Sequence, residues 1–250
     1  TSNRAGNRFL IHLFDAASGV LLAMVEADFL GMMRTGAASG IAAKWLARSE
    51  SSEAGVFGAG WQAEGHIQAI CAALPLRRVK VFARHKEKLA AFCARMSVAT
   101  GVEIFPAASA QAVVEGSDLI GTVTTAALPL FDAEWLDQGV HINAAGSNSL
   151  IRQELSEAAV RRCDLVCVDT LATALAEAGD LLPLLEKGRL QQRALVELGD
   201  VIVGRRDGRS SSAQITLFES QGMAVQDLAV AARVFGVARE LGLGVALPLA

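Results

Sequence analysis

No run of apolar residues in this 250-residue sequence approaches the roughly 20 that a membrane-spanning helix needs. Basic residues form no stripe and the formal net charge is −3, which argues against a nucleic acid as partner. The opening stretch TSNRAGNRF lacks the apolar core of a secretory signal. The sequence therefore predicts a cytoplasmic protein that binds neither membranes nor nucleic acids.

Cysteine is also scarce, and no two of the cysteines have C-x-x-C spacing. The four are Cys71, Cys93, Cys163 and Cys167. No histidine spacing completes a zinc site, so we predict no bound metal. Each thiol lies in an apolar stretch, which favours buried cysteines in a reducing cytoplasm. The G-x-S-x-G nucleophile turn and the Walker phosphate loop are absent as well.

What the sequence does contain is a series of short apolar runs separated by segments with helical spacing. The runs are Ala54–Phe57, Val79–Phe82, Val102–Phe105, Asp118–Val123, Val140–Ala144 and Leu165–Val168. The helical segments are Gln62–Ala73, Lys86–Met96, Ser109–Val114 and Ser156–Arg161. This alternation predicts βαβ units and a mostly parallel sheet with helices on both faces. The predicted fold class is α/β, with a Rossmann-type doubly wound sheet.

The two ends of the chain break this alternation. Ile11–Phe14 reads as a strand, Asp15–Gly19 as a turn and Gly222–Gly244 as an amphipathic helix. The predicted apolar face of that helix comprises Leu228, Ala231, Ala232, Phe235 and Ala238, and the polar face Gln226, Arg233 and Glu240. We expect residues 1–34 and 222–250 to form a discontinuous second domain, and residues 35–221 to form the nucleotide-binding domain.

The most specific motif reads G-x-G-x-x-A and lies between an apolar strand and a helix. Its first glycine permits a tight turn, its second lets the backbone approach a pyrophosphate, and its alanine keeps the helix close to the sheet. The helix start offers free N–H groups to phosphates. The predicted contacts to NAD or NADP are Gly58, Gly60, Trp61, Gln62 and Ala63. A purely structural glycine turn is the alternative.

The strand after this motif ends in Arg84-His85-Lys86, without an acidic residue. Proteins that prefer NAD often carry Asp or Glu there, about twenty residues beyond the glycines, to bind the ribose. Arg84 can instead pair with the 2′-phosphate of NADP through its planar guanidinium, with His85 and Lys86 assisting. The sequence thus favours NADP over NAD, although a solvated basic turn explains the same residues.

Two later strands end in small and polar residues, at the edge where open α/β sheets bind ligands. The candidate cofactor contacts there are Thr122, Thr124, Asn143, Ala144 and Gly146. Ordinary turn chemistry explains the threonines and Asn143 as well. We expect His141 to be structural and Asn148 to meet a substrate.

Arg34 lies at the start of a predicted glycine- and alanine-rich helix that runs to about Ala47. A cation is disfavoured at a helix N-terminus. We therefore expect Arg34 to hold an anionic substrate group, or else to pair with an acid such as Asp28. Thr35 is a further candidate cofactor contact. Two other carboxylates are expected to cap helices, namely Asp180 and Asp227.

Taken together, these segments resemble the ornithine cyclodeaminase/mu-crystallin family over nearly the whole chain. The motifs that carry the resemblance are Leu13-Phe14-Asp15-Ala16 with Gly19, Arg34-Thr35-Gly36-Ala37-Ala38-Ser39, Trp45-Leu46-Ala47-Arg48, Gly58-Ala59-Gly60-Trp61-Gln62-Ala63, Trp135-Leu136, His141-Ile142-Asn143-Ala144-Ala145-Gly146, Glu154-Leu155, Gly179-Asp180, Ile215-Thr216-Leu217-Phe218, and Gly222 with Asp227-Leu228-Ala229. The resemblance implies a homodimer that uses NAD or NADP on small amino or imino acids, with Arg34 holding the substrate carboxylate.

Two departures from the family pattern matter. The sequence starts where the family has already passed a sizeable N-terminal segment, so we expect a fragment. The cyclodeaminases carry Asp where Asn148 stands, and an amide cannot act as a general base. We therefore expect a dehydrogenase or a reductase of ketimine or pyrroline-carboxylate type. An ammonia-releasing ornithine cyclodeaminase, a non-catalytic NADPH-dependent binding protein of mu-crystallin type and an inactive fragment are the alternatives.

Overall fold

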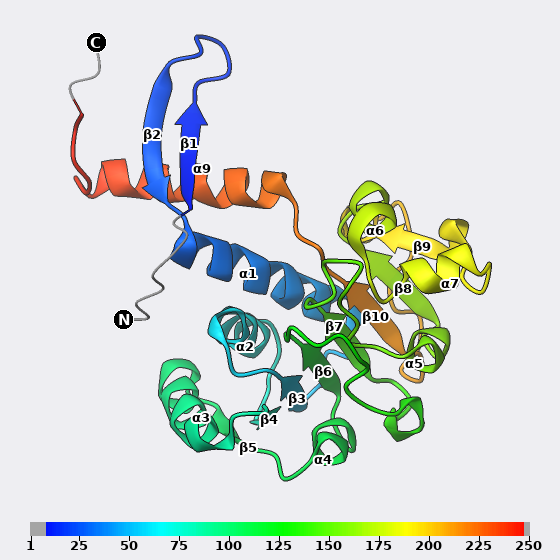
Figure 1. The fold of residues 1–250 in the computed structure, drawn as a ribbon. Coiled ribbons are helices and arrows are strands. Elements are labelled where there is room, and N and C mark those ends of the chain that lie inside the picture. Colours follow the sequence, from blue (N-terminus) through cyan, green and yellow to red (C-terminus); the bar gives the residue numbers. More distant parts are fainter. Residues whose placement is uncertain (1–8, 248–250) are drawn as a thin grey trace.

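The computed structural model describes residues 9–247. The predicted second domain extends past these limits at both ends, and residues 1–8 and 248–250 lie outside the described residues. The central element is a sheet of eight parallel strands in the order β5-β4-β3-β6-β7-β10-β8-β9 (Figure 1). The strands are β3 (Glu53–Phe57), β4 (Arg78–Phe82), β5 (Glu103–Pro106), β6 (Leu119–Thr122), β7 (His141–Ala144), β8 (Leu165–Val168), β9 (Leu195–Glu197) and β10 (Thr216–Glu219).

The order reverses between β3 and β6, because the chain first builds outward through β4 and β5 and then returns to the other side of β3. This doubly wound arrangement confirms the predicted fold class. A ligand site is expected beyond the carboxyl ends of the strands at this reversal.

Two strands of the sheet were not predicted from the sequence. β10 comes late in the chain yet lies between β7 and β8, with Leu217 paired to Ile142 on one side and Val166 on the other. Its four residues are all buried, so they show no alternation of polar and apolar side chains. β9 has only three residues, too few for any period to be read.

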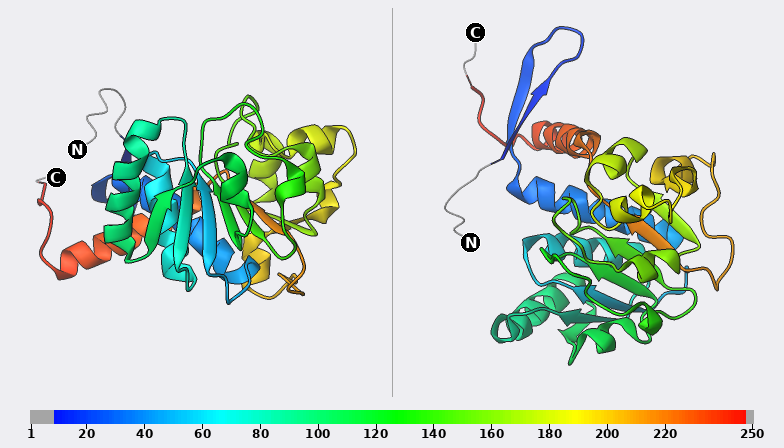
Figure 2. Two further views of the ribbon diagram at one scale, coloured as in Figure 1. Left: turned by 90° about the horizontal axis from the view of Figure 1, so that it is seen from below. Right: turned by 45° about the vertical axis from the view of Figure 1, so that its right-hand side comes forward.

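Helices cover both faces of the sheet (Figure 2). One face packs against α1 (Asp28–Leu46), α2 (Trp61–Ala73), α3 (Lys86–Thr100) and α8 (Leu198–Ile202). The other packs against α4 (Ala110–Val114), α5 (Glu157–Arg161), α6 (Leu171–Glu177), α7 (Leu182–Glu186) and the 3-10 turn Ala133–Trp135. The side chains of neighbouring residues in a strand point to opposite faces of the sheet. Val56 packs in the core on the side of α2 and α3, whereas Phe57 packs in the core on the side of α4 and α5.

The start of the predicted helix at Arg34 is wrong, because α1 begins at Asp28. The segment ahead of Arg34 is helical too: Leu30 and Met32 are buried, and Asp28 lies favourably in the first turn. The boundary predicted after Arg34 therefore falls inside one continuous helix. α1 also lies against α2, since a Cβ at Gly36 would stand 2.3 Å from the carbonyl carbon of Gly65.

Outside the sheet, the N-terminal part forms a hairpin of β1 (Leu10–Phe14) and β2 (Leu21–Glu26) (Figure 1). The Asp15 carboxylate closes its turn by accepting hydrogen bonds from Ser18 N at 2.8 Å and Ser18 Oγ at 2.7 Å. The hairpin lies beside α9 (Ala224–Glu240), the C-terminal helix predicted from its periodicity.

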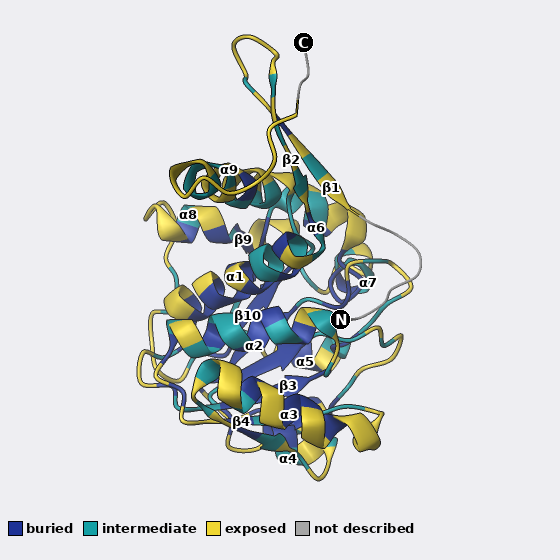
Figure 3. Cartoon of the chain, turned by 90° about the vertical axis from the view of Figure 1, so that its left-hand side faces the viewer, coloured by how far each residue is buried: buried dark blue, intermediate teal, exposed yellow. Residues whose placement is uncertain are grey.

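The predicted apolar face of α9 is only partly covered. Ala231 is buried and Phe235 packs with it against Leu13 and Leu30, but Leu228 is 56% exposed. The single chain therefore does not bury the whole predicted face, because β1 and α1 cover only a narrow stripe of the helix. Figure 3 shows exposed residues along both the hairpin and α9.

None of the described helices is long and apolar enough to cross a membrane. All four cysteines are free; Cys93 and Cys167 are buried, while Cys71 and Cys163 are partly buried. Burial raises the pKa of Cys167 to about 12, so this thiol stays protonated at neutral pH.

Candidate active site at the carboxyl edge of the sheet

A cavity of about 770 Å³ opens at the carboxyl ends of β3, β4, β6, β7 and β10. Among the described residues that line it there is no Asp or Glu, whereas Arg34, Arg84, Lys88 and Arg152 all contribute. A concave site with one sign of charge attracts ligands of the opposite sign. The cavity is therefore suited to an anionic ligand, although the chain as a whole carries a net charge of −3.

The glycine turn between β3 and α2 forms one wall of this cavity. Gly58 has φ of +115°, and a Cβ there would stand 2.4 Å from the Val123 carbonyl oxygen, so only glycine fits. At Gly60 a Cβ would meet nothing within 4 Å, because this position faces open space. Gly60 is also the residue before the first turn of α2, whose free N–H groups lie beside it. The turn thus has the shape and the donors that a pyrophosphate needs.

The other residues of the motif serve the turn in different ways. Trp61 and Gln62 line the cavity, whereas Ala63 is completely buried against the sheet. Trp61 donates from Nε1 to the Asp28 carbonyl oxygen at 3.4 Å and meets the Phe29 ring edge to face. These contacts attach the start of α2 to the start of α1.

The basic turn after β4 forms the far end of the cavity. Arg84, His85 and Lys88 line it. Arg84 is exposed and, within residues 9–247, forms no ion pair that would occupy its guanidinium. Lys86, predicted to assist, does not line the cavity, because α3 begins at that residue.

The structure separates the candidates at the later strand ends. Thr35, Thr124 and Gly146 line the cavity, but Thr122, Asn143 and Ala144 are buried in the sheet away from it. Asn143 donates from Nδ2 to the Ser39 carbonyl oxygen at 3.1 Å, so it braces β7 against α1.

His141 is structural, as expected from the sequence. Its Nδ1 lies 2.9 Å from Thr216 Oγ1 and its Nε2 3.0 Å from Asn143 Oδ1. Complete burial lowers the pKa of His141 to about 3, so the ring is neutral and holds two strands together.

Arg34 enters the cavity from the interior of α1 and not from a helix end. Its Nε lies 2.9 Å from Asp227 Oδ1, and its Nη1 donates to Gln226 Oε1 at 3.1 Å. The partner is thus Asp227 of α9 and not Asp28. The capping role predicted for Asp227 is wrong, because within the described chain no side chain caps α9 and this carboxylate pairs with Arg34.

Asn148 lines the cavity after β7, where the sequence predicted a substrate contact. Its Oδ1 accepts a hydrogen bond from Arg152 Nη1 at 3.0 Å. Sequence reasoning missed Arg152, since one arginine in a loop carries no motif. The bond leaves the amide NH₂ of Asn148 as the group free to donate to a ligand.

His66 is a second lining residue that the sequence analysis missed. The side chain is 3% exposed, and neither ring nitrogen has a hydrogen-bond partner among the described residues. Burial lowers the pKa of His66 to about 4, so the ring is neutral. Its place one turn after Gln62, which also lines the cavity, is a signal that helix periodicity alone could have provided.

Three carboxyl groups lie behind the cavity wall, completely buried. Asp180 accepts hydrogen bonds from Glu154 N at 2.8 Å and Leu155 N at 3.0 Å, so its predicted role as a helix cap is wrong. Ser147 Oγ bonds to the carboxyl group of Glu219. Within the described part of the chain, none of the three forms an ion pair.

The third carboxyl group, Glu154, shapes the cavity directly. It accepts hydrogen bonds from Thr124 N at 2.6 Å and Gly146 N at 2.8 Å, and so ties the loops after β6 and β7 together. A Cβ at Gly146 would stand 2.4 Å from the Glu154 carboxyl carbon and from the Thr124 carbonyl oxygen. Only glycine allows this closure.

Because no cation of the described residues pairs with these groups, burial is not offset, and their pKa values rise. Burial raises the pKa of Asp180 to about 6, and burial together with the Asp180 charge raises the pKa of Glu219 well above its usual value. A carboxyl pKa that is higher in the folded state stabilises the fold below the unfolded-state pKa, and this contribution is lost as pH rises through the folded-state pKa.

We therefore expect Glu219→Gln to be more stable than the parent protein at pH 8, because the Gln side chain carries no charge that burial would penalise. The difference is expected to shrink as the pH falls towards 4, because Glu219 then takes up its proton in the unfolded state as well. Urea unfolding of both proteins between pH 4 and 8 measures it. His66 and His141 have lowered pKa values and destabilise both proteins equally in acid, so they cancel in the comparison. A difference that is independent of pH would refute this account.

A doubly wound parallel sheet, a glycine turn at its switch point and a cavity lined with cations together define a dinucleotide-binding α/β enzyme. Comparison with known proteins is more specific: the chain belongs to the ornithine cyclodeaminase/mu-crystallin family, whose family model matches residues 5–241. The predicted resemblance is thereby confirmed.

Individual relatives agree with this assignment. The chain is 37% identical over 236 residues to a delta(1)-pyrroline-2-carboxylate reductase of Bacillus cereus, covering 94% of this chain and 72% of that protein. It is 35% identical to an alanine dehydrogenase of Archaeoglobus fulgidus, covering 90% and 69%. Among solved structures, a delta(1)-pyrroline-2-carboxylate reductase of Thermococcus litoralis in complex with NADH and L-proline matches with a TM-score of 0.91 and 34% identity, covering 95% and 74%. These relatives confirm the predicted class, an oxidoreductase or cyclodeaminase acting on amino or imino acids.

Proposed function

We propose that this protein reduces the C=N bond of a small cyclic imino acid, of the Δ1-pyrroline-2-carboxylate type, with NADPH or NADH. The observation that carries the proposal is the cavity without acidic residues among its described lining, which places Arg34 beside the glycine turn. A nicotinamide dinucleotide and an imino acid both present anionic groups, which the four cations of this cavity would receive.

Each wall of the cavity has a separate role in this proposal. The free N–H groups at the start of α2, beside Gly60, bind the pyrophosphate. The part of the cavity wall that contains Thr124 and Gly146 faces the nicotinamide. Arg34 binds the substrate carboxylate through the parts of its guanidinium that Asp227 and Gln226 leave free. When bound, the reduced nicotinamide would supply the hydride to the imine carbon, and solvent water would supply the proton to the nitrogen.

Asn148 favours reduction over cyclodeamination. Its carboxamide has no accessible pKa, so it cannot take up or release the protons that ammonia loss requires. It can donate a hydrogen bond from its NH₂ group to a ligand or a water, because Arg152 occupies its oxygen. Asn148 is therefore assigned to orient the reacting imine.

The experiment that tests this function offers Δ1-pyrroline-2-carboxylate with NADPH or NADH, and L-ornithine with NAD⁺, to the same preparation. The proposal expects stoichiometric loss of nicotinamide absorbance with the imino acid and no ammonia from ornithine. Ammonia release without net change in absorbance would assign the protein to the cyclodeaminases. Tight NADPH binding without turnover would assign it to the binding proteins.

We further propose that NADPH is the preferred cofactor, because Arg84 is exposed in the cavity and lacks an acidic partner among the described residues. Reversing the charge with Arg84→Asp is expected to weaken NADPH binding by about tenfold or more, the value of one charge-assisted hydrogen bond, and to change NADH binding far less. Fluorescence titration measures both affinities. Arg77→Asp, an exposed position outside the cavity, is the matched control. Equal weakening of both cofactors would leave Arg84 without a role in specificity.

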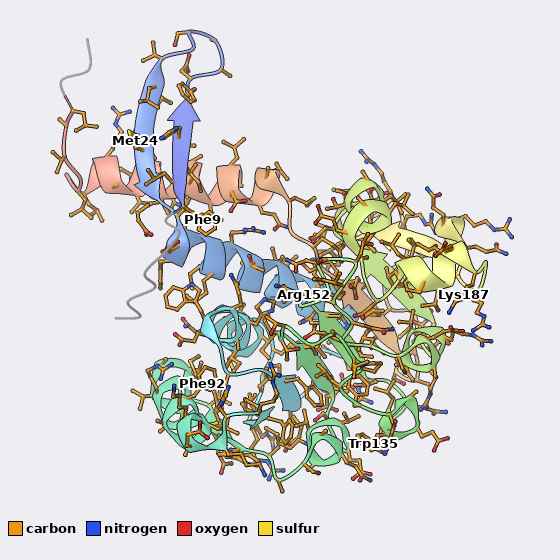
Figure 4. All side chains as sticks on the ribbon, viewed as in Figure 1. Phe9, Met24, Phe92, Trp135, Arg152 and Lys187 are labelled. Atoms are coloured by element: carbon orange, nitrogen blue, oxygen red, sulfur yellow. The ribbon has the colours of Figure 1, made fainter. Side chains whose placement is uncertain are left out.

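We propose that the hairpin and α9 belong to the second domain, residues 1–34 and 222–250, and that a second copy of the chain covers their apolar surface. Phe14, Met24 and Leu228 are each at least 48% exposed there, and Met24 projects from the hairpin (Figure 4). A related archaeal alanine dehydrogenase, 31% identical, is described as a dimer. A monomeric mass in solution would contradict this proposed dimer.

The four free thiols support a cytoplasmic location.

A further inference from the structure

A buried carboxylate outside the cavity wall connects the sheet to Arg34. Asp169 follows β8 directly and is 5% exposed. Its Oδ2 accepts hydrogen bonds from Ser220 Oγ at 2.9 Å, Gln221 N at 2.9 Å and Gly222 N at 2.7 Å. All three donors lie on the segment between β10 and α9. This carboxylate therefore fixes the path of the chain into α9.

The second oxygen of Asp169 acts on a side chain of α9. Its Oδ1 accepts a hydrogen bond from Gln226 Nε2 at 2.9 Å, and Gln226 Oε1 in turn accepts from Arg34 Nη1 at 3.1 Å. An amide presents an oxygen on one side and an NH₂ group on the other. Because Asp169 holds the NH₂ side, the oxygen side must face Arg34.

The same segment sets how closely the backbone approaches the guanidinium. Gly222 has φ of +85°, and a Cβ there would stand 2.5 Å from Arg34 Nη1. Asp227 holds the Nε side of the same group. Arg34 is thus held on one side by three residues from the start of α9 and the segment before it, and that segment is anchored to the sheet by Asp169.

We propose that Asp169 is a positioning residue for substrate binding: it orients the Gln226 amide so that Arg34 is held in the geometry that receives the substrate carboxylate. The proposal rests on the function proposed above, in which Arg34 binds that carboxylate. It assigns to Asp169 no contact with the substrate. Its effect on the reaction passes through Gln226 and Arg34 alone.

Exchanging polarity along this chain of hydrogen bonds tests the proposal. In Asp169→Asn, the oxygen of the new amide keeps the three donors of the 220–222 segment, so its NH₂ group confronts Gln226 Nε2. Gln226 then turns over and presents its NH₂ group to Arg34. We expect KM for Δ1-pyrroline-2-carboxylate to rise about tenfold, the loss of one hydrogen bond to a charged group, with kcat changed much less.

The double variant Asp169→Asn/Gln226→Glu restores the acceptors without changing the total charge. The carboxylate introduced at position 226 accepts from the new amide with one oxygen and from Arg34 with the other. KM is therefore expected to return to within about threefold of the parent, since a restored hydrogen bond recovers most of its lost value. A role in folding alone would lower Tm in Asp169→Asn without raising KM. Asp118→Asn is the matched control. Its new amide can likewise keep the backbone N–H donors of Ser52 and Glu53 on one oxygen but loses the acceptor for Arg48, so it is expected to lower Tm without raising KM.

The variant Arg34→Gln distinguishes a failure of the proposed substrate site from a failure of the role proposed for Asp169. If Arg34→Gln leaves KM unchanged, Arg34 is no carboxylate site, and both the proposed substrate site and this inference fail. If Arg34→Gln raises KM, the inference expects Asp169→Asn to add nothing in that background, because its effect passes through Arg34. An undiminished effect there, or failure of the double variant to recover, would overturn the role of Asp169 while leaving the proposed function intact.

Discussion

Gly60→Ala is expected to weaken NADPH binding by about 100-fold, equivalent to the loss of two charge-assisted hydrogen bonds to phosphate, while Tm stays within about 2 °C of the parent. The fold tolerates the methyl group, because a Cβ at Gly60 would meet no protein atom within 4 Å. The methyl group would occupy the space through which a pyrophosphate approaches the backbone. Isothermal titration with NADPH and thermal unfolding without ligand measure the two effects on one preparation.

Gly58→Ala provides the contrasting variant. A Cβ at Gly58 would stand 2.4 Å from the Val123 carbonyl oxygen, and the φ of +115° is strained for any residue with a side chain. We expect this variant to lose at least about 5 °C in Tm before any ligand is added, given roughly 1–3 kcal/mol for the strain alone. A Gly60→Ala protein that binds NADPH as tightly as the parent would show that the turn is purely structural.

Arg34→Gln is expected to raise KM for Δ1-pyrroline-2-carboxylate by about 100-fold, because a buried carboxylate loses a bidentate charged partner. Arg34→Lys keeps the charge but not the planar fork, so we expect an intermediate rise of about tenfold. Steady-state kinetics with NADPH at saturation measures both. Arg233→Gln, an exposed change on α9, is the control and is expected to leave KM unchanged.

A substrate without the carboxylate provides the sharpest check on that assignment. With 1-pyrroline in place of Δ1-pyrroline-2-carboxylate, the parent and Arg34→Gln are expected to react equally slowly, because the interaction that distinguishes them is gone. If Arg34→Gln were equally damaging with both substrates, the arginine would act on the cofactor or on the fold, and the carboxylate site would lie elsewhere.

The sequence predicts the sheet well where each strand follows a helix of clear period. β3, β4 and β6 lie within one or two residues of their predicted limits because they are apolar and bounded by turns. β10 was missed as a strand because its four residues are all buried and show no alternation of polar and apolar side chains. Its place between β7 and β8, which both precede it in the chain, was not predicted either. Which late segment returns between two earlier strands is decided by tertiary packing, and no local pattern records it.

The residues of the candidate site also differ in whether the sequence predicts them. The glycine turn was predictable because each of its residues meets a local backbone requirement. The support of Arg34 was not, since Asp169, Gln226 and Asp227 come from segments more than 130 residues further along the chain. Position near the end of a strand also proved too coarse a guide: Asn143, the penultimate residue of β7, bonds to α1, whereas Gly146 lies in the cavity.

The measurement that tests the central claim most directly follows a deuterium label. The protein is incubated with NADPH deuterated at the transferable position and with Δ1-pyrroline-2-carboxylate, and the product is analysed by mass spectrometry and NMR. The account predicts proline carrying one deuterium at its α-carbon for each NADPH consumed. Unlabelled proline, or no proline while NADPH remains bound, would contradict reduction of the C=N bond in this cavity.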